Sequence, residues 1–196
     1  MSTINPTLDV AIHLVQPTNS SLSIEDIIKR CLDNDRVAQA KLYKTYHGKL
    51  LALCMRYCAN RDDALAVLNQ GFLKVFHNLE SYNNKYDFGG WIYRIVQYTA
   101  IDHVRKHLRK SKQMPTQELD VEIEIASTVI EKMYAEDLME LMHKLPFTSK
   151  VVFNLFAIEG YSHADIAKEL GMSIGTSKWH VNNARKRLKE WIETYE

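Results

Sequence analysis

Apolar residues recur at intervals of three and four along the first half of the chain, which is the spacing of a buried helix face. Ser23, followed by two acidic residues, predicts the start of the first helix, because a serine oxygen satisfies free amides at a helix end. The stripe that predicts the next helix consists of Leu42, Tyr46, Leu50, Leu53 and Tyr57. A third helix is predicted to start near residues 61–63 and to bury Ala64, Leu68, Phe72, Val75 and Leu79.

The second half of the chain repeats this helical spacing after an interruption. Residues 81–87 are polar and turn-prone, which predicts a loop. A long helix over 88–110 follows, with the inward residues Ile92, Ile95, Val96, Val104 and Leu108. Pro115 and the acidic stretch after it have poor periodicity and predict a linker. Further helices are predicted at about 130–145, 148–158, 162–170 and 173–195.

Composition supports an all-α protein. Seven glycines and four prolines among 196 residues are few compared with a usual share of about 12%, and a sheet protein needs more turn residues. Three cysteines are too few for a disulfide framework. No lysine or arginine precedes Lys29, and no apolar run approaches the roughly 20 residues of a membrane span. We therefore expect a cytoplasmic protein without membrane insertion.

The net charge of +1 argues, taken whole, against a nucleic-acid ligand. The distribution of charge along the chain weakens this argument. Residues 103–114 contain five basic and no acidic residues, and residues 173–189 do the same. Residues 115–140 between them contain eight acidic residues and one lysine. A single charge run usually indicates a solvated surface, but two acid-free clusters on candidate DNA-facing helices favour phosphate contact at both.

Residues 161–178 have the pattern of a helix-turn-helix. Ser162 predicts a helix cap, Ala167 is small where two helices would cross, and Gly171 suits a left-handed turn. Ser173 predicts the cap of a second helix, which would read bases in the major groove. Asn183 is predicted to face outward beside the residues predicted to contact duplex DNA, namely Thr176, Lys178, Trp179, Asn182, Arg185 and Lys186. A helical hairpin with a glycine turn is the plainer alternative.

The helix predicted over 88–110 has a second, polar and aromatic face. Aromatic rings and amides beside a basic stripe suit the unstacked bases of single-stranded DNA. The residues predicted to capture such a strand are Tyr82, Asn83, Asn84, Lys85 and Tyr86 in the loop and Trp91, Arg94, Gln97, Tyr98, Arg105 and Arg109 on the helix. The alternative, that Trp91, Tyr93 and Tyr98 are core aromatics of a small bundle, remains open.

Two sets of motifs resemble the two conserved regions of one protein family. The runs FGGWIYRI (88–95) and IDHVRK (101–106) resemble region 2 of bacterial sigma factors of the extracytoplasmic-function (ECF) group. Four later runs resemble region 4 of the same group: LP (145–146), EGYS (159–162), IAKELGMSIGTSK (166–178) and ARKRL (184–188). The resemblance covers roughly residues 23–190, and the order and separation of both motifs make it specific.

The resemblance implies two small helical domains that bind core RNA polymerase and direct it to promoters. Region 4 would read the −35 element as duplex, and region 2 would melt the −10 element and capture a flipped base in loop 82–87. The implied division is a flexible arm (1–22), region 2 (23–111), an acidic linker (112–129) and region 4 (130–196). The linker is expected to run near the RNA path of the polymerase, and the family alone suggests an anti-sigma factor as a further partner.

The third predicted helix departs from the family pattern on its polymerase-facing side. Members commonly carry acids there, whereas this chain has Leu65, Ala66 and Gln70. The face expected to dock on the polymerase consists of Ala66, Asn69, Gln70 and Leu73. Fewer charge pairs are available, so we expect either that this interface depends on apolar and amide contacts or that polymerase binding is weak. Ser177 and Trp179-His180 also depart from the usual recognition helix, so the promoter sequence does not follow from the family.

No cofactor, metal or catalytic site is predicted. Cys54 and Cys58 share a helix face, but two thiols do not make a four-ligand zinc site. His103 and His107 are four apart without the glutamate of a metalloprotease helix. Two alternatives to a sigma factor remain: a stand-alone helix-turn-helix regulator that binds a palindrome, and a metal-dependent helical enzyme that uses these histidines and nearby acids.

Overall fold

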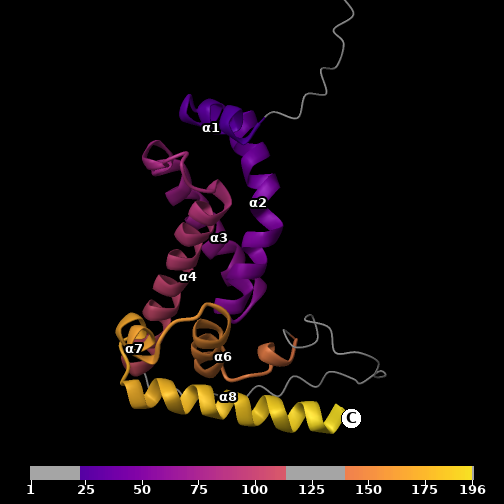
Figure 1. Cartoon of the computed structure of the whole chain (residues 1–196), viewed down its shortest axis with the longest axis vertical. Helices are drawn as coiled ribbons and strands as arrows, with labels where there is room; N and C mark the ends of the chain where they lie inside the picture. Colours follow the sequence, from indigo (N-terminus) through magenta and orange to yellow (C-terminus); the bar gives the residue numbers. More distant parts are fainter. Residues whose placement is uncertain (1–22, 114–139, 196) are drawn as a thin grey trace, which may run out of the picture.

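The computed structural model describes residues 23–113 and 140–195, and throughout these two ranges the chain forms helices joined by turns and loops (Figure 1). The all-α prediction is therefore confirmed. The N-terminal bundle comprises α1 (Ile24–Leu32), α2 (Arg36–Tyr57), α3 (Arg61–His77), the short 3-10 turn η1 (Leu79–Ser81) and α4 (Phe88–Gln113). The predicted arm (1–22) and most of the predicted linker lie outside the described residues.

Side-chain caps begin the helices where the sequence placed them. The Ser23 hydroxyl accepts a hydrogen bond from the Asp26 amide at 3.1 Å, and the Asp26 carboxylate accepts one from the Ser23 amide at 3.3 Å. This reciprocal box satisfies two amides that the first turn leaves free. Asn60 caps α3 through a single backbone contact, in which its side-chain oxygen accepts from the Asp63 amide at 2.8 Å.

The predicted apolar stripes form the core of the bundle. Leu42, Leu50, Leu53 and Tyr57 are buried on α2, and Tyr46 is half-buried. All five residues predicted for the third stripe are buried, although α3 ends at His77 and Leu79 lies in η1. Each fully buried leucine contributes about 1.5–3 kcal/mol of transfer free energy. Hydrophobic burial therefore holds α2, α3 and α4 together.

Helices α3 and α4 approach closely at Gly71. A Cβ atom at this position would lie 2.9 Å from Cγ2 of Val96, closer than packed carbon atoms come. The absence of a side chain therefore sets the spacing of these two helices. Ile92, Val96 and Val104 are buried along α4 as predicted, whereas Ile95 and Leu108 are half-buried.

The C-terminal unit, residues 140–195, contains α6 (Phe147–Phe153), a π-helical turn η2 (Asn154–Ile158), α7 (His163–Leu170) and α8 (Ile174–Tyr195). It sits at one end of the N-terminal bundle, and α8 runs across that end (Figure 1). The helix predicted over 148–158 is thus an α-helix that widens into a π-turn. Of the helix predicted over 130–145, residues 130–139 lie outside the described part of the chain.

The two units pack against each other. One hydrophobic cluster contains residues of α2 and α4 together with Val151, Val152, Leu155 and Ile166 of the C-terminal unit. A separate small cluster inside the C-terminal unit consists of Leu141, Met142, Leu145, Ala184 and Leu188. The sequence predicted two helical units and a tether but not this contact. None of the helices in the two described ranges has the length and apolar character needed to cross a membrane.

Candidate nucleic-acid interface

Helices α7 and α8 form the predicted helix-turn-helix. Ser162 and Asp165 make a reciprocal capping box at the start of α7. Gly171 ends α7 at φ +65°, a left-handed conformation that costs residues with a side chain more than it costs glycine. The Ser173 hydroxyl then accepts from the Thr176 amide at 2.9 Å and caps α8. These local signals fix the turn between the helices.

The exposed side of α8 presents the predicted duplex-reading residues. All six are exposed: Thr176, Lys178, Trp179, Asn182, Arg185 and Lys186. The Arg185 guanidinium lies 5.5 Å from the centroid of the Phe156 ring, a cation–π geometry that orients it. Asn183 was predicted to face outward, and this is wrong. It is half-buried and its amide lies 3.5 Å from the Ser149 hydroxyl of α6.

The loop before α4 is held by its own hydrogen bonds. The Tyr82 hydroxyl donates to the Tyr86 carbonyl, and the Asn83 side chain accepts from the Lys85 amide at 3.0 Å. Asp87 accepts from the Gly90 amide at 2.6 Å and so caps α4. Since the backbone is fixed in this way, Asn83, Asn84, Lys85 and Tyr86 are presented to solvent. Tyr86 is 71% exposed.

Tyr82 and Trp91 belong partly to the core beneath that loop. The Tyr82 ring lies 5.0 Å from the Phe88 ring and 5.3 Å from the Trp91 ring, measured between centroids. Both Tyr82 and Trp91 are half-buried. Both rings pack against the core, whereas Tyr86 is exposed. The core interpretation of Trp91 therefore holds in part, because its side chain packs against Phe88 and Tyr82 and yet remains half-buried.

Some residues on the polar face of α4 are exposed to solvent, whereas others bond to residues of the C-terminal unit. Arg94, Tyr98 and Arg109 are exposed as predicted. Gln97 was expected on the open face, but it is only 6% exposed and donates to the Glu159 carboxylate at 2.8 Å. Arg105 is half-buried and pairs with Glu169 at 2.6 Å. A helical pattern identifies a polar face but gives no sign of partners more than sixty residues away.

The predicted polymerase-docking face is open on α3. Ala66, Asn69, Gln70 and Leu73 are all exposed, and Leu73 is 59% exposed. The Asn69 side-chain oxygen accepts from the Tyr43 hydroxyl at 3.0 Å. This face therefore presents a leucine and two amides to solvent, and its role in polymerase binding stays a prediction.

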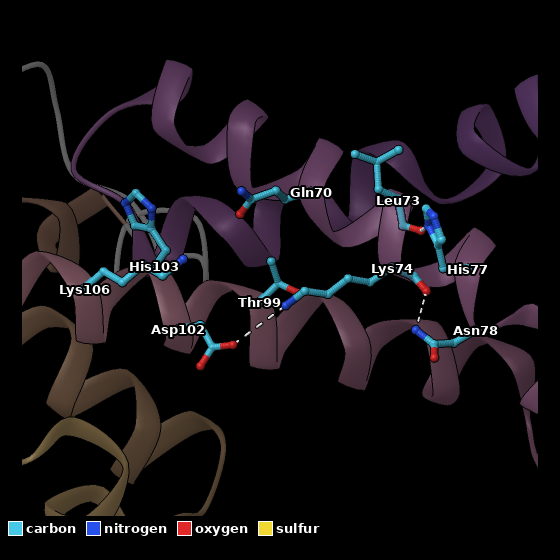
Figure 2. Close-up of a pocket in the computed structure, with 9 residues that line it drawn as sticks. All are labelled: Gln70, Leu73, Lys74, His77, Asn78, Thr99, Asp102, His103 and Lys106. Atoms are coloured by element: carbon cyan, nitrogen blue, oxygen red, sulfur yellow. Dashed lines mark hydrogen bonds and ion pairs between the residues drawn. The ribbon is translucent and has the colours of Figure 1, made fainter.

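A groove of about 500 Å³ lies between α3 and α4 next to this face (Figure 2). Gln70 and Leu73 line it and also belong to the docking face. Lys74 reaches across it, with its ammonium 3.7 Å from the Asp102 carboxylate of α4 (Figure 2). The groove therefore continues the same polar and apolar surface from α3 to α4.

The thiols and histidines do not form a metal site in the described ranges. Cys54 and Cys58 are buried, and burial raises the pKa of each thiol to about 12. The His107 ring contacts the Phe147 ring at 4.8 Å. Across residues 23–113 and 140–195, no group of three or more histidine, cysteine, aspartate or glutamate side chains could hold a metal ion.

Comparison with known proteins finds two family models in this chain. The model described as Sigma-70 region 2 matches residues 42–110, and the model described as Sigma-70, region 4 matches residues 135–188. The RNA polymerase sigma factor SigV of Bacillus subtilis is 30% identical over 138 residues, which cover 70% of this chain and 80% of that protein.

Other similar proteins extend over more of the chain. The ECF RNA polymerase sigma-E factor of Haemophilus influenzae is 24% identical over 183 residues, covering 88% of this chain and 96% of its own. A solved structure of CnrH in complex with the cytosolic domain of CnrY is 18% identical, with a TM-score of 0.43. It covers 87% of this chain and 97% of the CnrH chain.

Proposed function

Because the chain belongs to the ECF RNA polymerase sigma factors and carries sigma-70 regions 2 and 4, it directs transcription initiation, and we propose how its surfaces divide that task. Helix α8 reads the −35 element as duplex DNA. Loop 82–87 and the open face of α4 capture the melted −10 strand. The face of α3 binds core RNA polymerase. The protein performs no catalysis itself.

The observation that carries this division is the exposure of two separate sets of nucleic-acid-facing side chains. On α8 the set combines hydroxyl, amide and cationic groups, which match base edges and phosphates in a major groove, with the ring of Trp179, which can contact apolar groups there such as a thymine methyl. In loop 82–87 it consists of an exposed tyrosine, two asparagines and a lysine. Aromatic faces stack on unpaired bases, whereas a duplex offers none to them. Each set therefore suits a different state of the DNA.

The partners follow from the family and its setting. Core RNA polymerase and promoter DNA, both as duplex and as melted strand, are the binding partners, and the protein acts in the cytoplasm where both are found. The acidic tether between the regions would follow the path of the RNA, because both are negatively charged. An anti-sigma factor is a further partner that the family suggests. Both region models match this chain, which favours a sigma factor over the stand-alone regulator and the metal-dependent enzyme.

Run-off transcription with core RNA polymerase on fragmented genomic DNA tests the proposal. The purified protein should direct initiation at a small set of fragments that share two upstream sequence elements. Core polymerase alone should give none of these transcripts. Absence of initiation on every fragment, with a well-characterised sigma factor active in parallel, would contradict the proposed function.

A further inference from the structure

Helix α8 exposes one aromatic ring among its proposed duplex-reading residues. Trp179 is 60% exposed, whereas the other residues of that set carry hydroxyl, amide or cationic groups. Trp179 lies in the second turn of α8, which begins at Ile174. The N-terminal part of a recognition helix is the part that contacts base edges. The ring is therefore at a position that suits the reading of bases.

The fold restrains the orientation of this ring. The Trp179 and His180 rings meet edge to face, with centroids 4.9 Å apart and an interplanar angle of 77°. The His180 Nδ1 atom in turn lies 3.0 Å from the hydroxyl oxygen of Ser149, which is 1% exposed on α6. Edge-to-face ring pairs contribute stability beyond their buried area. A single exposed apolar residue needs no ligand, but a ring anchored through a histidine to a buried serine is pre-organised to meet one.

The surface around the ring is cationic. Residues 173–189 contain no acidic residue, and Lys178, Arg185 and Lys186 are exposed on the same helix. Such a surface attracts a phosphate backbone. The centre of a protein–protein interface, in contrast, is depleted of charged residues. Both facts favour DNA over a protein as the group that Trp179 contacts.

The chemistry of the major groove narrows what an indole ring can recognise there. Base faces are stacked in a duplex, so a side chain in the groove meets base edges. The C5-methyl group of thymine is the apolar group on those edges, which otherwise present hydrogen-bond donors and acceptors. Gly175, one turn before Trp179, leaves room for it, because a Cβ built there would meet Ser173 Oγ at an ordinary 3.6 Å. Residues four apart are neighbours on a helix surface, so this open position adjoins the indole.

We propose that Trp179 is a specificity-determining residue that reads the C5-methyl group of a thymine in the −35 element. Asn182, exposed three residues later, suits the N6 and N7 atoms of an adenine. Together the two side chains select A·T base pairs, and the methyl group marks the strand that carries the thymine. The proposal rests on the proposed function, since it takes α8 to be the helix that reads the duplex.

Replacement of thymine by uracil tests the proposal, because it removes the methyl group and keeps base pairing. The template is a promoter that the wild-type holoenzyme recognises in run-off transcription, with uracil at each −35 thymine of either strand in turn. At limiting holoenzyme, initiation should fall about fourfold at one of these positions, which is the effect of losing one buried methyl group. A template with uracil only between the two promoter elements is the control and should behave as the thymine template does.

Three variants connect this effect to the indole. Trp179→Ala should initiate equally well on the thymine and uracil templates, because the two changes remove the same contact. Trp179→Phe keeps an apolar ring and should retain a preference of about twofold or more for thymine. His180→Ala removes the ring that orients the indole and should bring the ratio of thymine to uracil initiation closer to one. A merely structural role of His180 would change initiation on both templates equally and leave that ratio unchanged.

Several results would overturn the proposal. They are equal initiation by wild type on thymine and uracil templates, a −35 element without an A·T base pair, and a wild-type ratio in Trp179→Ala. Equal loss of initiation on both templates in that variant would instead indicate that the ring contacts a protein. Loss of the preference in Trp179→Phe as well would assign the contact to the indole N–H and contradict methyl reading. Failure of the proposed function is a different result, namely that wild type itself directs no initiation with core polymerase.

Discussion

The two helices proposed to face DNA differ in what they contact in the folded chain. On α8 the side chains proposed to read duplex DNA are exposed to solvent, and Trp179 is 60% exposed. On α4, Gln97 and Arg105 are engaged by carboxylates of the other region. Exposed side chains can bind DNA directly. Gln97 and Arg105 must first break their bonds to Glu159 and Glu169 before they can bind another group. The comparison shows that the side chains proposed for duplex reading are exposed in the folded chain, whereas two of those proposed for strand capture already have partners within it.

The largest effect is expected at the Cys58 thiol, where Lys150 of α6 packs against the end of α2. Burial raises its pKa to about 12, so at pH 8 its thiolate fraction is about three orders of magnitude below that of a free cysteine. Iodoacetamide should therefore alkylate it about a thousandfold more slowly in the folded than in the denatured protein. Raising the pH should speed the reaction up to the raised pKa. Mass spectrometry of the alkylated peptides measures both rates.

Cys54 provides the control for that experiment. It lies one turn earlier on α2, is fully buried, and has the same raised pKa of about 12. Cys54 should therefore react about as slowly as Cys58 in the folded protein, because burial raises the pKa of both thiols alike. A folded-state rate for either thiol close to its rate in the denatured protein would contradict the burial described for this end of α2.

The next largest effect is expected on α8, whose proposed DNA-reading side chains are exposed. Replacing Lys178 and Arg185 together by alanine should lower initiation at a −35-dependent promoter about a hundredfold, because each specific contact is worth about 1–3 kcal/mol. Lys189→Ala is the matched control. Its ammonium lies 3.6 Å from the Glu193 carboxylate on the same helix and outside the reading face. A comparable loss in the control would mean that only the overall charge of α8 matters.

A smaller effect is expected in the loop. Tyr86→Ala should weaken binding of the melted −10 strand about tenfold or more, since stacking of one base on an aromatic ring is worth about 1–3 kcal/mol. Tyr86→Phe keeps the ring and should bind as wild type does. Anisotropy with a −10 strand in the presence of core polymerase makes the measurement. If the phenylalanine variant is as weak as the alanine variant, the ring is not the binding element.

The smallest effect concerns the bundle that supports the α4 face. Gly71→Ala should destabilise the protein by about 1 kcal/mol or more, because the added Cβ lies 2.9 Å from Val96 Cγ2. Gly48→Ala in α2 has open space around the new methyl group and should stabilise the protein by about 0.5–1 kcal/mol. Urea denaturation of both variants gives the two free energies of unfolding. Destabilisation by both would contradict the packing described for Gly71.

The sequence predicted those features that depend on neighbours within one helix or turn. Ser23, Ser162 and Ser173 cap the helices for which they were identified, and Gly171 adopts the left-handed turn. A cap or turn depends on residues three or four positions apart, so a linear pattern contains the information. The six residues predicted to read duplex DNA are all exposed on α8, as a helical pattern can indicate, while their contact with DNA stays a prediction.

The contact between the regions could not be predicted in this way. Gln97 and Arg105 meet acids that follow 62 and 64 residues later, and no period in the sequence relates such positions. Lys150 would be assigned to the surface from its residue type alone, since lysine is rarely buried, yet it is 4% exposed. Glu159 and Glu169 lie in a stretch without a dominant charge, so no charge run marks them. Their partners are visible only in the folded chain.

The most direct test of the central claim is photo-cross-linking within an initiation complex. A benzophenone amino acid replaces Trp179 on α8 in one variant and Tyr86 in loop 82–87 in another, both at exposed aromatic positions. The account predicts that the first cross-links to duplex DNA at the −35 element and the second to the melted strand at the −10 element. Cross-linking of both positions to the same element, or of the Tyr86 position to duplex DNA alone, would contradict it.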